Sequence, residues 1–383
     1  MSNERKEEKE EQAYAYWLAN CSGLGNQTKR RLEIYAGSAK AVYGMKETDL
    51  KGILTQKQIK SLMEAGRETD KEKLMEHYAV LKKQNIHFYP ISHPNYPNRL
   101  KTIGNPPYAI YVEGRLPEEK IPAVAVIGAR QCSEYGRYMA EQCGQELAKS
   151  GIIVISGMAR GIDGISQWAA LQADGFSCGI LGCGTDICYP SENRKLYETL
   201  KSRGGILSEW PPGTSPRPEL FPLRNRIISG MADLVLIIEA REKSGTLITA
   251  DLALEQGREV YVVPGRVTDS LSAGCNRLLC QGAGLLISVQ EMLEETGMVH
   301  SQKIGEGKTE GDMKALLNSG SEEMNRILEV LDFYPRSLDE IQAESGMEYG
   351  KMMFALMNLC IEGMAEQLAA GQFIKKRKRE TDE

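Results

Sequence analysis

Histidine is scarce in this chain, which has four histidines among 383 residues. None of the four, His77, His87, His93 and His300, lies in a glycine-rich loop that follows a predicted strand. A hydrolase that relies on a serine or cysteine nucleophile beside a histidine base is therefore not expected. Long apolar runs are absent as well, since no stretch approaches the roughly 18 apolar residues of a membrane-spanning helix. We therefore expect no membrane span.

The chain also lacks two common nucleotide-binding motifs. A dinucleotide fingerprint has three glycines in the turn after the first strand, but the turn at 128–133 has one, Gly128, together with Arg130. A pyrophosphate could not approach this backbone closely, so NAD and FAD are not expected. The complete Gly-x-x-x-x-Gly-Lys-Ser/Thr phosphate loop does not occur, which argues against a P-loop ATPase. We predict no cofactor.

Cysteine usage points to a reducing compartment, because nine cysteines, an odd number, are scattered through the chain. Cys178, Cys183 and Cys188 lie close together and suggest a metal site. However, no histidine is near them, and Cys178 and Cys183 flank an apolar strand, so we expect burial and predict no metal. The charged start of the sequence has no apolar signal-peptide core, and we expect a cytoplasmic protein.

Positive charge is not in excess, because the formal net charge is −5. Any nucleic-acid site must therefore be a local basic groove on an acidic body. Two runs have a suitable composition: 156–163, Ser-Gly-Met-Ala-Arg-Gly-Ile-Asp, and 221–226, Phe-Pro-Leu-Arg-Asn-Arg. In the first, small residues between a predicted strand and a helix let a phosphate approach backbone N–H groups. In the second, two guanidiniums flank an amide, which suits phosphate oxygens and base edges.

Apolar strands alternate with helices through the middle of the chain. This pattern indicates a mostly parallel sheet covered on both faces, and thus an α/β, extended Rossmann-like, doubly wound fold. The predicted strands are 108–112, 124–127, 152–155, 178–181, 206–208, 234–238, 260–263 and 285–287. The predicted helices are 135–150, 164–173, 193–203, 225–231, 247–256 and 276–281.

Ligands bind at the carboxyl ends of the strands in such sheets, and glycine- or arginine-bearing loops fall there. These loops are 128–130, 156–161, 182–184, 243–246 and 264–266. Several arginines on one predicted rim favour a track for phosphates over isolated surface charges. The arginines are Arg130, Arg160, Arg224 and Arg226, and the candidates for base stacking are Tyr189, Trp210 and Phe221.

Two of these arginines have a competing interpretation. Arg224 and Arg226 could instead be structural, paired with carboxylates such as Glu239 and Asp233. Asp163, at the start of a predicted helix, fits a partner for the helix dipole better than a general base. No pair of groups on the rim is suited to acid–base catalysis.

Smaller modules are predicted at both ends of the chain. Residues 1–85 are predicted to form a helical domain of the SAM or helix-hairpin-helix type, in which the turn at 22–25 precedes a basic helix. The backbone amides of such a turn can bind a DNA phosphate. Alternatively, the domain is a small helical packing module. Thr55 is a candidate helix cap, and Ser337 with Glu340 fits a capping box. The predicted order is completed by a Rossmann-like domain at 86–300, a linker at 301–320, a winged-helix-like domain at 321–374 and a basic tail at 375–383.

The combination of motifs resembles the DNA-processing protein A family, DprA or Smf. The resemblance covers most of 91–287. It is carried by Tyr96-Pro97, Pro106-Pro107, 126–130, Tyr135-Gly136, 156–163, 189–193, Ser208-Glu209, 221–226, 244–250, 256–260 and 263–265. One departure is that the family usually has Ala-His where this chain has Ser166-Gln167, and the loss of that histidine argues further against catalysis.

The resemblance implies a non-enzymatic cytoplasmic protein that binds single-stranded DNA in the groove of its Rossmann-like domain. It further implies a homodimer that loads the RecA recombinase onto DNA during natural transformation in competent cells. A leucine cluster near 276–286 marks the expected dimer surface, although the same leucines could simply be core. The DNA-binding residues implied are Arg130, Ser156, Gly157, Arg160, Gly161, Arg224, Asn225, Arg226, Ser244, Gly245 and Thr246.

An enzyme is the alternative. Rossmann-like phosphoribohydrolases of the lysine-decarboxylase-like group use a similar sheet and a Gly-Gly-x-Gly-Thr-x-x-Glu loop. The corresponding loop here, 244–249, ends in Thr249 where the catalytic glutamate belongs. Nucleotide hydrolysis that depends on Glu239 or Asp163 would favour this alternative.

Overall fold

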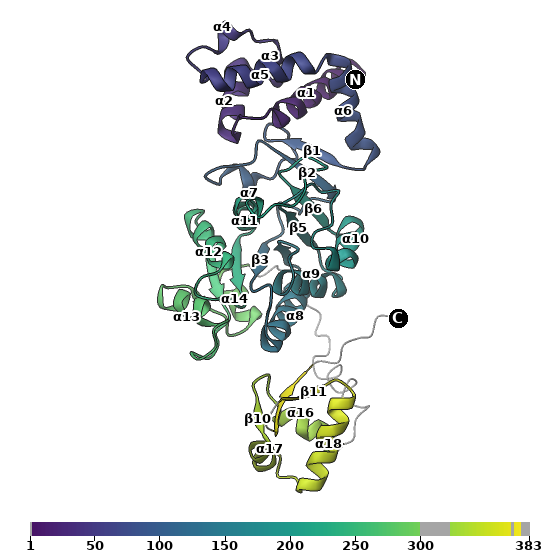
Figure 1. Cartoon of the computed structure of the whole chain (residues 1–383), viewed down its shortest axis with the longest axis vertical. Helices are drawn as coiled ribbons and strands as arrows, with labels where there is room; N and C mark the ends of the chain where they lie inside the picture. Colours follow the sequence, from purple (N-terminus) through teal and green to yellow (C-terminus); the bar gives the residue numbers. More distant parts are fainter. Residues whose placement is uncertain (1, 299–321, 369–370, 377–383) are drawn as a thin grey trace. The chain divides into compact units, whose positions relative to one another are not determined.

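The computed structural model describes residues 2–298, 322–368 and 371–376, and Figure 1 labels its elements. It divides into two compact units, a larger one with residues 2–132 and 139–298 and a smaller one with residues 133–138 and the described residues from 322 onward. The predicted linker at 301–320 and tail residues 377–383 lie outside the described residues. No helix in the described ranges is long and apolar enough to cross a membrane.

The larger unit begins with a group of helices. They are α1 (Ser2–Asn20), α2 (Asn26–Ala36), α3 (Ala39–Gly44), α4 (Glu47–Leu50), α5 (Gln56–Glu68) and α6 (Lys71–Lys83). Leu18, Leu32 and Leu62, from three of them, are fully buried in a shared apolar core. The predicted cap at Thr55 is confirmed, because Gln58 N donates to its hydroxyl and its own N–H donates to Gln58 Oε1 at 3.0 Å.

A sheet of nine strands follows, in the order β1-β2-β6-β5-β4-β3-β7-β8-β9. Strands β3 to β9 pair in parallel, whereas β1 and β2 are antiparallel additions at one edge. The predicted mostly parallel, Rossmann-like sheet is therefore confirmed. The strands are β1 (His87–Pro90), β2 (Ala109–Gly114), β3 (Ala123–Ile127), β4 (Ile153–Ser156), β5 (Ser177–Leu181), β6 (Gly205–Ser208), β7 (Leu234–Ile237), β8 (Glu259–Val262) and β9 (Gly284–Leu285).

Helices cover both faces of the sheet because successive strands are added first on one side of β3 and then on the other. From β3 to β6 each strand is added on one side, and from β7 to β9 on the other. Right-handed crossovers then place the two sets of helices on opposite faces, and Figure 1 shows α11 and α12 on the other side of the sheet from α9 and α10. The helices are α8 (Glu134–Lys149), α9 (Ile162–Gln172), α10 (Arg194–Arg203), α11 (Leu220–Met231), α12 (Gly245–Glu255), α13 (Ala273–Cys280) and α14 (Val289–Glu295).

Two local predictions differ from the structure. The sequence does not predict β1, because its four residues end in Pro90 and a proline-rich stretch favours a connector. The strand forms nevertheless, because it lies at the edge of the sheet, where proline is tolerated. α11 begins at Leu220 rather than at 225. Pro222 lies in its first turn, where a proline has no intrahelical bond to lose. The run at 221–226 is therefore helical.

The smaller unit has the winged-helix architecture that was predicted. Its elements are α16 (Glu322–Val330), β10 (Arg336–Ser337), α17 (Leu338–Ser345), α18 (Tyr349–Ile361), β11 (Ala365–Leu368) and β12 (Gln372–Lys375), with sheet order β10-β12-β11. Ile327, Leu356 and Phe373 form part of its buried core. The predicted capping box at Ser337 and Glu340 is confirmed.

Candidate nucleic-acid interface

The loops at the carboxyl edge of the sheet adjoin one another because their strands do. Strands β5, β4, β3, β7 and β8 are neighbours in that order, and each is followed by one of the predicted glycine- or arginine-bearing loops. The chain changes direction between β3 and β7, and such a switch point opens a crevice beyond the strand ends. We call this sheet edge, with its loops, the rim.

The turn after β4 is tied to the loop after β3. Ser156 is fully buried and donates its hydroxyl hydrogen to Val126 O at 2.6 Å. Gly161 has a φ of 72°, and a Cβ there would lie 2.3 Å from Ala129 O. Only glycine fits this position, because both the left-handed backbone and the close carbonyl exclude a side chain. The two loops therefore form one rigid piece of the rim.

The backbone amides of this turn already have partners inside the protein. Gly157 N donates to Asp163 Oδ2 at 3.2 Å, and Met158 N donates to Gln167 Oε1 at 3.0 Å. The amide of Gly157 thus binds a carboxylate of the protein itself, that of Asp163. Asp163 lies in the first turn of α9, where its charge interacts favourably with the helix dipole, as predicted. Burial raises the pKa of Asp163. Gln167, where the family usually has histidine, is a buried structural group that also donates to Ser177 Oγ at 3.1 Å.

Arg224 is buried, contrary to its predicted position on the surface of the rim. It is 4% exposed, and its Nη1 donates to Ile180 O at 2.5 Å. A Cβ on Gly157 would lie 2.0 Å from Arg224 Nη1 and 2.7 Å from Asp163 Oδ2, so the guanidinium and the carboxylate both pack against this glycine. Burial lowers the pKa of Arg224 to about 10, while the nearby Asp163 carboxylate acts in the opposite direction.

Arg226 is buried as well, at 9% exposure. Its Nη2 donates to both carboxylate oxygens of Glu209, at 2.7 and 2.8 Å. Both arginines therefore have the buried, carboxylate-paired environment of the structural alternative. The carboxylates are Asp163 for Arg224 and Glu209 for Arg226, not the predicted Glu239 and Asp233. Asp233 instead pairs with Arg99, at 2.9 Å.

A stack of side chains lies on the rim instead, in which Arg130 and Tyr189 are exposed and Phe221 is half-buried. The Tyr189 and Phe221 rings are stacked, with centroids 5.5 Å apart and planes at 28°. The guanidinium carbon of Arg130, which is exposed, lies 5.5 Å from the centre of the Phe221 ring. Tyr189 is 43% exposed. We call Arg130, Tyr189 and Phe221 the platform; it presents flat rings beside a cation, which suits planar, negatively charged ligands.

The remaining predicted residues surround the platform loops to different extents. Arg160 is exposed and forms a surface ion pair with Glu192. Thr246 Oγ1 donates to Gly128 O at 3.3 Å and thereby ties the start of α12 to the loop after β3. Asn225 and Ser244 are half-buried, Gly245 is exposed, and Trp210 is half-buried rather than part of the platform.

Nothing in the described ranges forms a metal cluster of three or more ligands. Cys178 and Cys183 are buried, as predicted, and burial raises the pKa values of their thiols to about 12 and about 11. Neither thiol is therefore a thiolate at neutral pH, which is the form that binds metals.

The fold and the rim define a Rossmann-like protein whose sheet edge carries arginines and aromatic rings, together with a winged-helix unit. The chain belongs to the DNA recombination-mediator protein A family, DprA, whose model matches residues 87–297. The DprA winged helix domain model matches residues 312–371. The resemblance identified from the motifs is thereby confirmed.

Individual relatives agree with this assignment. The chain is 38% identical over 218 residues to the DNA processing protein DprA of Bacillus subtilis, covering 57% of this chain and 73% of the relative. It is 37% identical over 268 residues to DprA of Streptococcus pneumoniae, covering 64% and 95%. The X-ray structure of DNA processing protein A from Streptococcus pneumoniae matches with a TM-score of 0.66 and 33% identity, over 74% of this chain and 97% of that chain.

Proposed function

We propose that this protein binds single-stranded DNA along the rim, with bases stacked on the platform. The observation that carries the proposal is the stack of Phe221 with the exposed side chains Arg130 and Tyr189. Stacking on aromatic rings accepts any base, and a guanidinium beside the rings neutralises the adjoining phosphate. Duplex DNA hides the faces of its bases, so a stacking platform favours unpaired strands.

The other predicted residues have two kinds of role in this proposal. Arg130 and Arg160 supply positive charge, while Gly245, Thr246 and Asn225 line the neighbouring loops. Arg224 and Arg226 hold the platform in place from below, because both lie on α11, the helix that carries Phe221. Ser156, Gly157 and Gly161 shape the turn rather than bind phosphate with their amides.

Membership of the DprA family supports a wider role for this activity. In the proposal, the protein is a non-enzymatic, cytoplasmic homodimer that delivers the RecA recombinase onto single strands during natural transformation. A non-enzymatic role is supported by Thr249, which occupies the position of the catalytic glutamate in the phosphoribohydrolase loop. Sedimentation of the full chain and co-purification with RecA would test the assembly.

We expect the protein to bind a single strand about tenfold more tightly than a duplex of equal length at physiological salt. The measurement is fluorescence anisotropy with both DNAs, repeated over a range of salt concentrations. Equal affinity for the duplex would contradict the proposal and would point to the winged-helix unit as the DNA-binding part.

Arg130→Ala is expected to flatten the salt dependence of single-strand binding. Each phosphate neutralised on a single strand contributes about 0.7 to the log–log slope, so the slope should fall by about that amount. Arg67→Ala is a matched control, because Arg67 is an exposed arginine on α5. An unchanged slope in the Arg130 variant would place this guanidinium outside the DNA path.

A further inference from the structure

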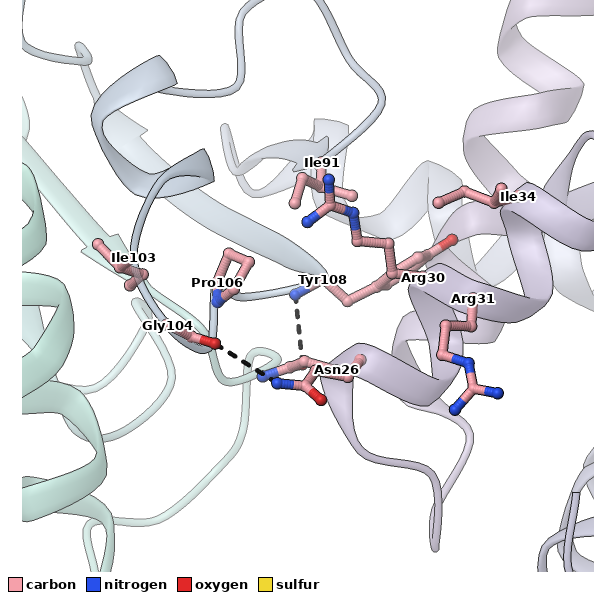
Figure 2. A pocket seen from close by; sticks show the side chains of 10 residues that line it. Asn26, Arg30, Arg31, Ile34, Ile91, Ile103, Gly104, Pro106 and Tyr108 are labelled. Carbon is pink, nitrogen blue, oxygen red and sulfur yellow. Dashed lines mark hydrogen bonds between the residues drawn. The ribbon is translucent and has the colours of Figure 1, made fainter. Parts of the chain in front are cut away.

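A cavity of about 340 Å³ lies in the larger unit, between α2 and the segments that flank β1 and β2. One wall is a face of α2 with Asn26, Arg30 and Ile34, and the opposite wall includes Ile91, Pro106 and Tyr108. Figure 2 shows these side chains around the opening. None of the platform residues and none of the DNA-binding residues implied by the resemblance lines this pocket, although α2 is the basic helix that follows the turn at 22–25.

The pocket lies on the same sheet edge as the rim. β2 runs antiparallel to β6, with Tyr111 opposite Ser208, the last residue of β6. Tyr108, which precedes β2, is therefore beyond the carboxyl end of β6. Pro90 at the end of β1 is opposite Ala109, so Ile91 projects beyond the same edge. The pocket and the rim are thus neighbours along one continuous edge.

The distance along this edge is short. From β2 the order is β6, β5, β4 and then β3. Tyr189 follows β5 and Arg130 follows β3, so two to four inter-strand steps of about 4.8 Å amount to about 10–19 Å. A stacked strand advances about 3.4 Å per nucleotide, so about three to six nucleotides cross this distance. One DNA strand can therefore reach the pocket from the platform.

The chemistry of the pocket suits a nucleotide. Arg30 is exposed and forms no ion pair or hydrogen bond with the residues that the structure describes. Its guanidinium extends toward Ile91 (Figure 2). Ile34 is 71% exposed at the same face. A free guanidinium over an apolar wall can bind a phosphate while the wall covers a base or sugar.

The pocket wall is fixed rigidly to the rim. Asn26 Nδ2 donates to Glu209 Oε1 at 2.6 Å, and Asn26 Oδ1 accepts from Tyr108 N at 3.2 Å. Glu209 is the carboxylate that also holds Arg226. α2 is therefore attached through two hydrogen bonds to the strand ends, and the pocket keeps its position relative to the rim.

We infer that this pocket is a second subsite for the same DNA single strand, binding a nucleotide a few positions away from the platform. The inference rests on the proposed function. An acidic peptide from a protein partner could also bind the guanidinium of Arg30. It would not need the neighbouring rim, so the continuity of the pocket with the rim favours DNA.

The test compares two oligothymidines on the full-length protein by fluorescence anisotropy. One has about three nucleotides, too few to lie on the platform and also reach the pocket, and the other has about twenty and reaches both subsites. Arg30→Ala should weaken binding of the longer strand by about threefold to tenfold and flatten its salt slope by about 0.7. Binding of the short strand should not change. Ile34→Asp, at an exposed position, should act in the same direction, and Arg67→Ala should affect neither strand.

Each outcome bears on one proposal. If the wild-type protein binds neither strand, the proposed function fails. If it binds both, and Arg30→Ala leaves both affinities unchanged or lowers them equally, the second subsite is refuted while the platform stands. Competition for the pocket by an acidic peptide, without competition by the longer DNA, would also refute the subsite and identify a protein-binding pocket.

Discussion

Phe221→Leu is expected to weaken single-strand binding by about fivefold to a hundredfold, because base–aromatic stacking contributes about 1–3 kcal/mol per base. Leucine keeps the apolar contact that Phe221 makes with the loop after β5, where a Cβ on Gly182 would lie 2.9 Å from the ring. It removes the flat face on which a base stacks and to which Arg130 is adjacent. The measurement is the affinity for oligothymidine together with the melting temperature.

Phe221→Tyr is the matched control, since it keeps the ring at the same place on α11. Its affinity should stay close to that of the wild type. The stacking model would be contradicted if both variants bind like the wild type, or if the leucine variant loses affinity only in proportion to a lower melting temperature.

The layers of the fold were predictable because their signal is periodic and repeated. Each central strand is a continuous buried run, as β3 shows with five buried residues in succession. Such runs between helices admit one arrangement, a parallel sheet with helices on both faces. The position of the binding edge follows from the same pattern, since the loops after these strands must lie together. β1 lacked such a signal, because it is short, at the sheet edge and ends in proline.

The burial of Arg224 agrees with the structural alternative and not with the phosphate track, and the sequence carries a signal for it. Leu220, Arg224 and Ile228 are spaced four residues apart, and all three are buried on one face of α11. With the helix start predicted at 225, this spacing falls outside the predicted helix, so the sequence alone leaves both the phosphate contact and the structural role open for Arg224. Its buried environment depends on Asp163 and Gly157, which lie some sixty residues earlier in the sequence.

The platform was only partly predictable. Phe221 and Tyr189 were named as stacking candidates, but nothing in their sequence spacing shows that the two rings meet. Their contact depends on where the loop after β5 and the start of α11 are placed by the sheet order. The pocket beside α2 depends on a similar long-range arrangement, because its walls come from α2 and from the segments that flank β1 and β2.

Arg226→Ala is expected to destabilise the larger unit rather than to change the DNA contacts directly. The side chains of Arg226 and Glu209 are each 11% exposed in their ion pair, and removing one partner leaves a buried carboxylate without its counter-charge. Breaking a buried pair in this way costs about 3–5 kcal/mol, which should lower the melting temperature by about 10 °C. The salt slope of single-strand binding, measured below the melting temperature, should remain as in the wild type.

Two further variants separate this role from a phosphate contact. Arg226→Met combined with Glu209→Gln removes both charges and should regain much of the lost stability, because neutral groups of similar shape replace the pair without leaving a buried charge. Arg160→Ala removes an arginine whose side chain is 61% exposed, and its surface pair contributes about 0–1 kcal/mol, so the melting temperature should hardly change while the salt slope falls by about 0.7. A normal melting temperature with a reduced slope in Arg226→Ala would show that this guanidinium leaves Glu209 to bind phosphate, and the structural role assigned to it would then be wrong.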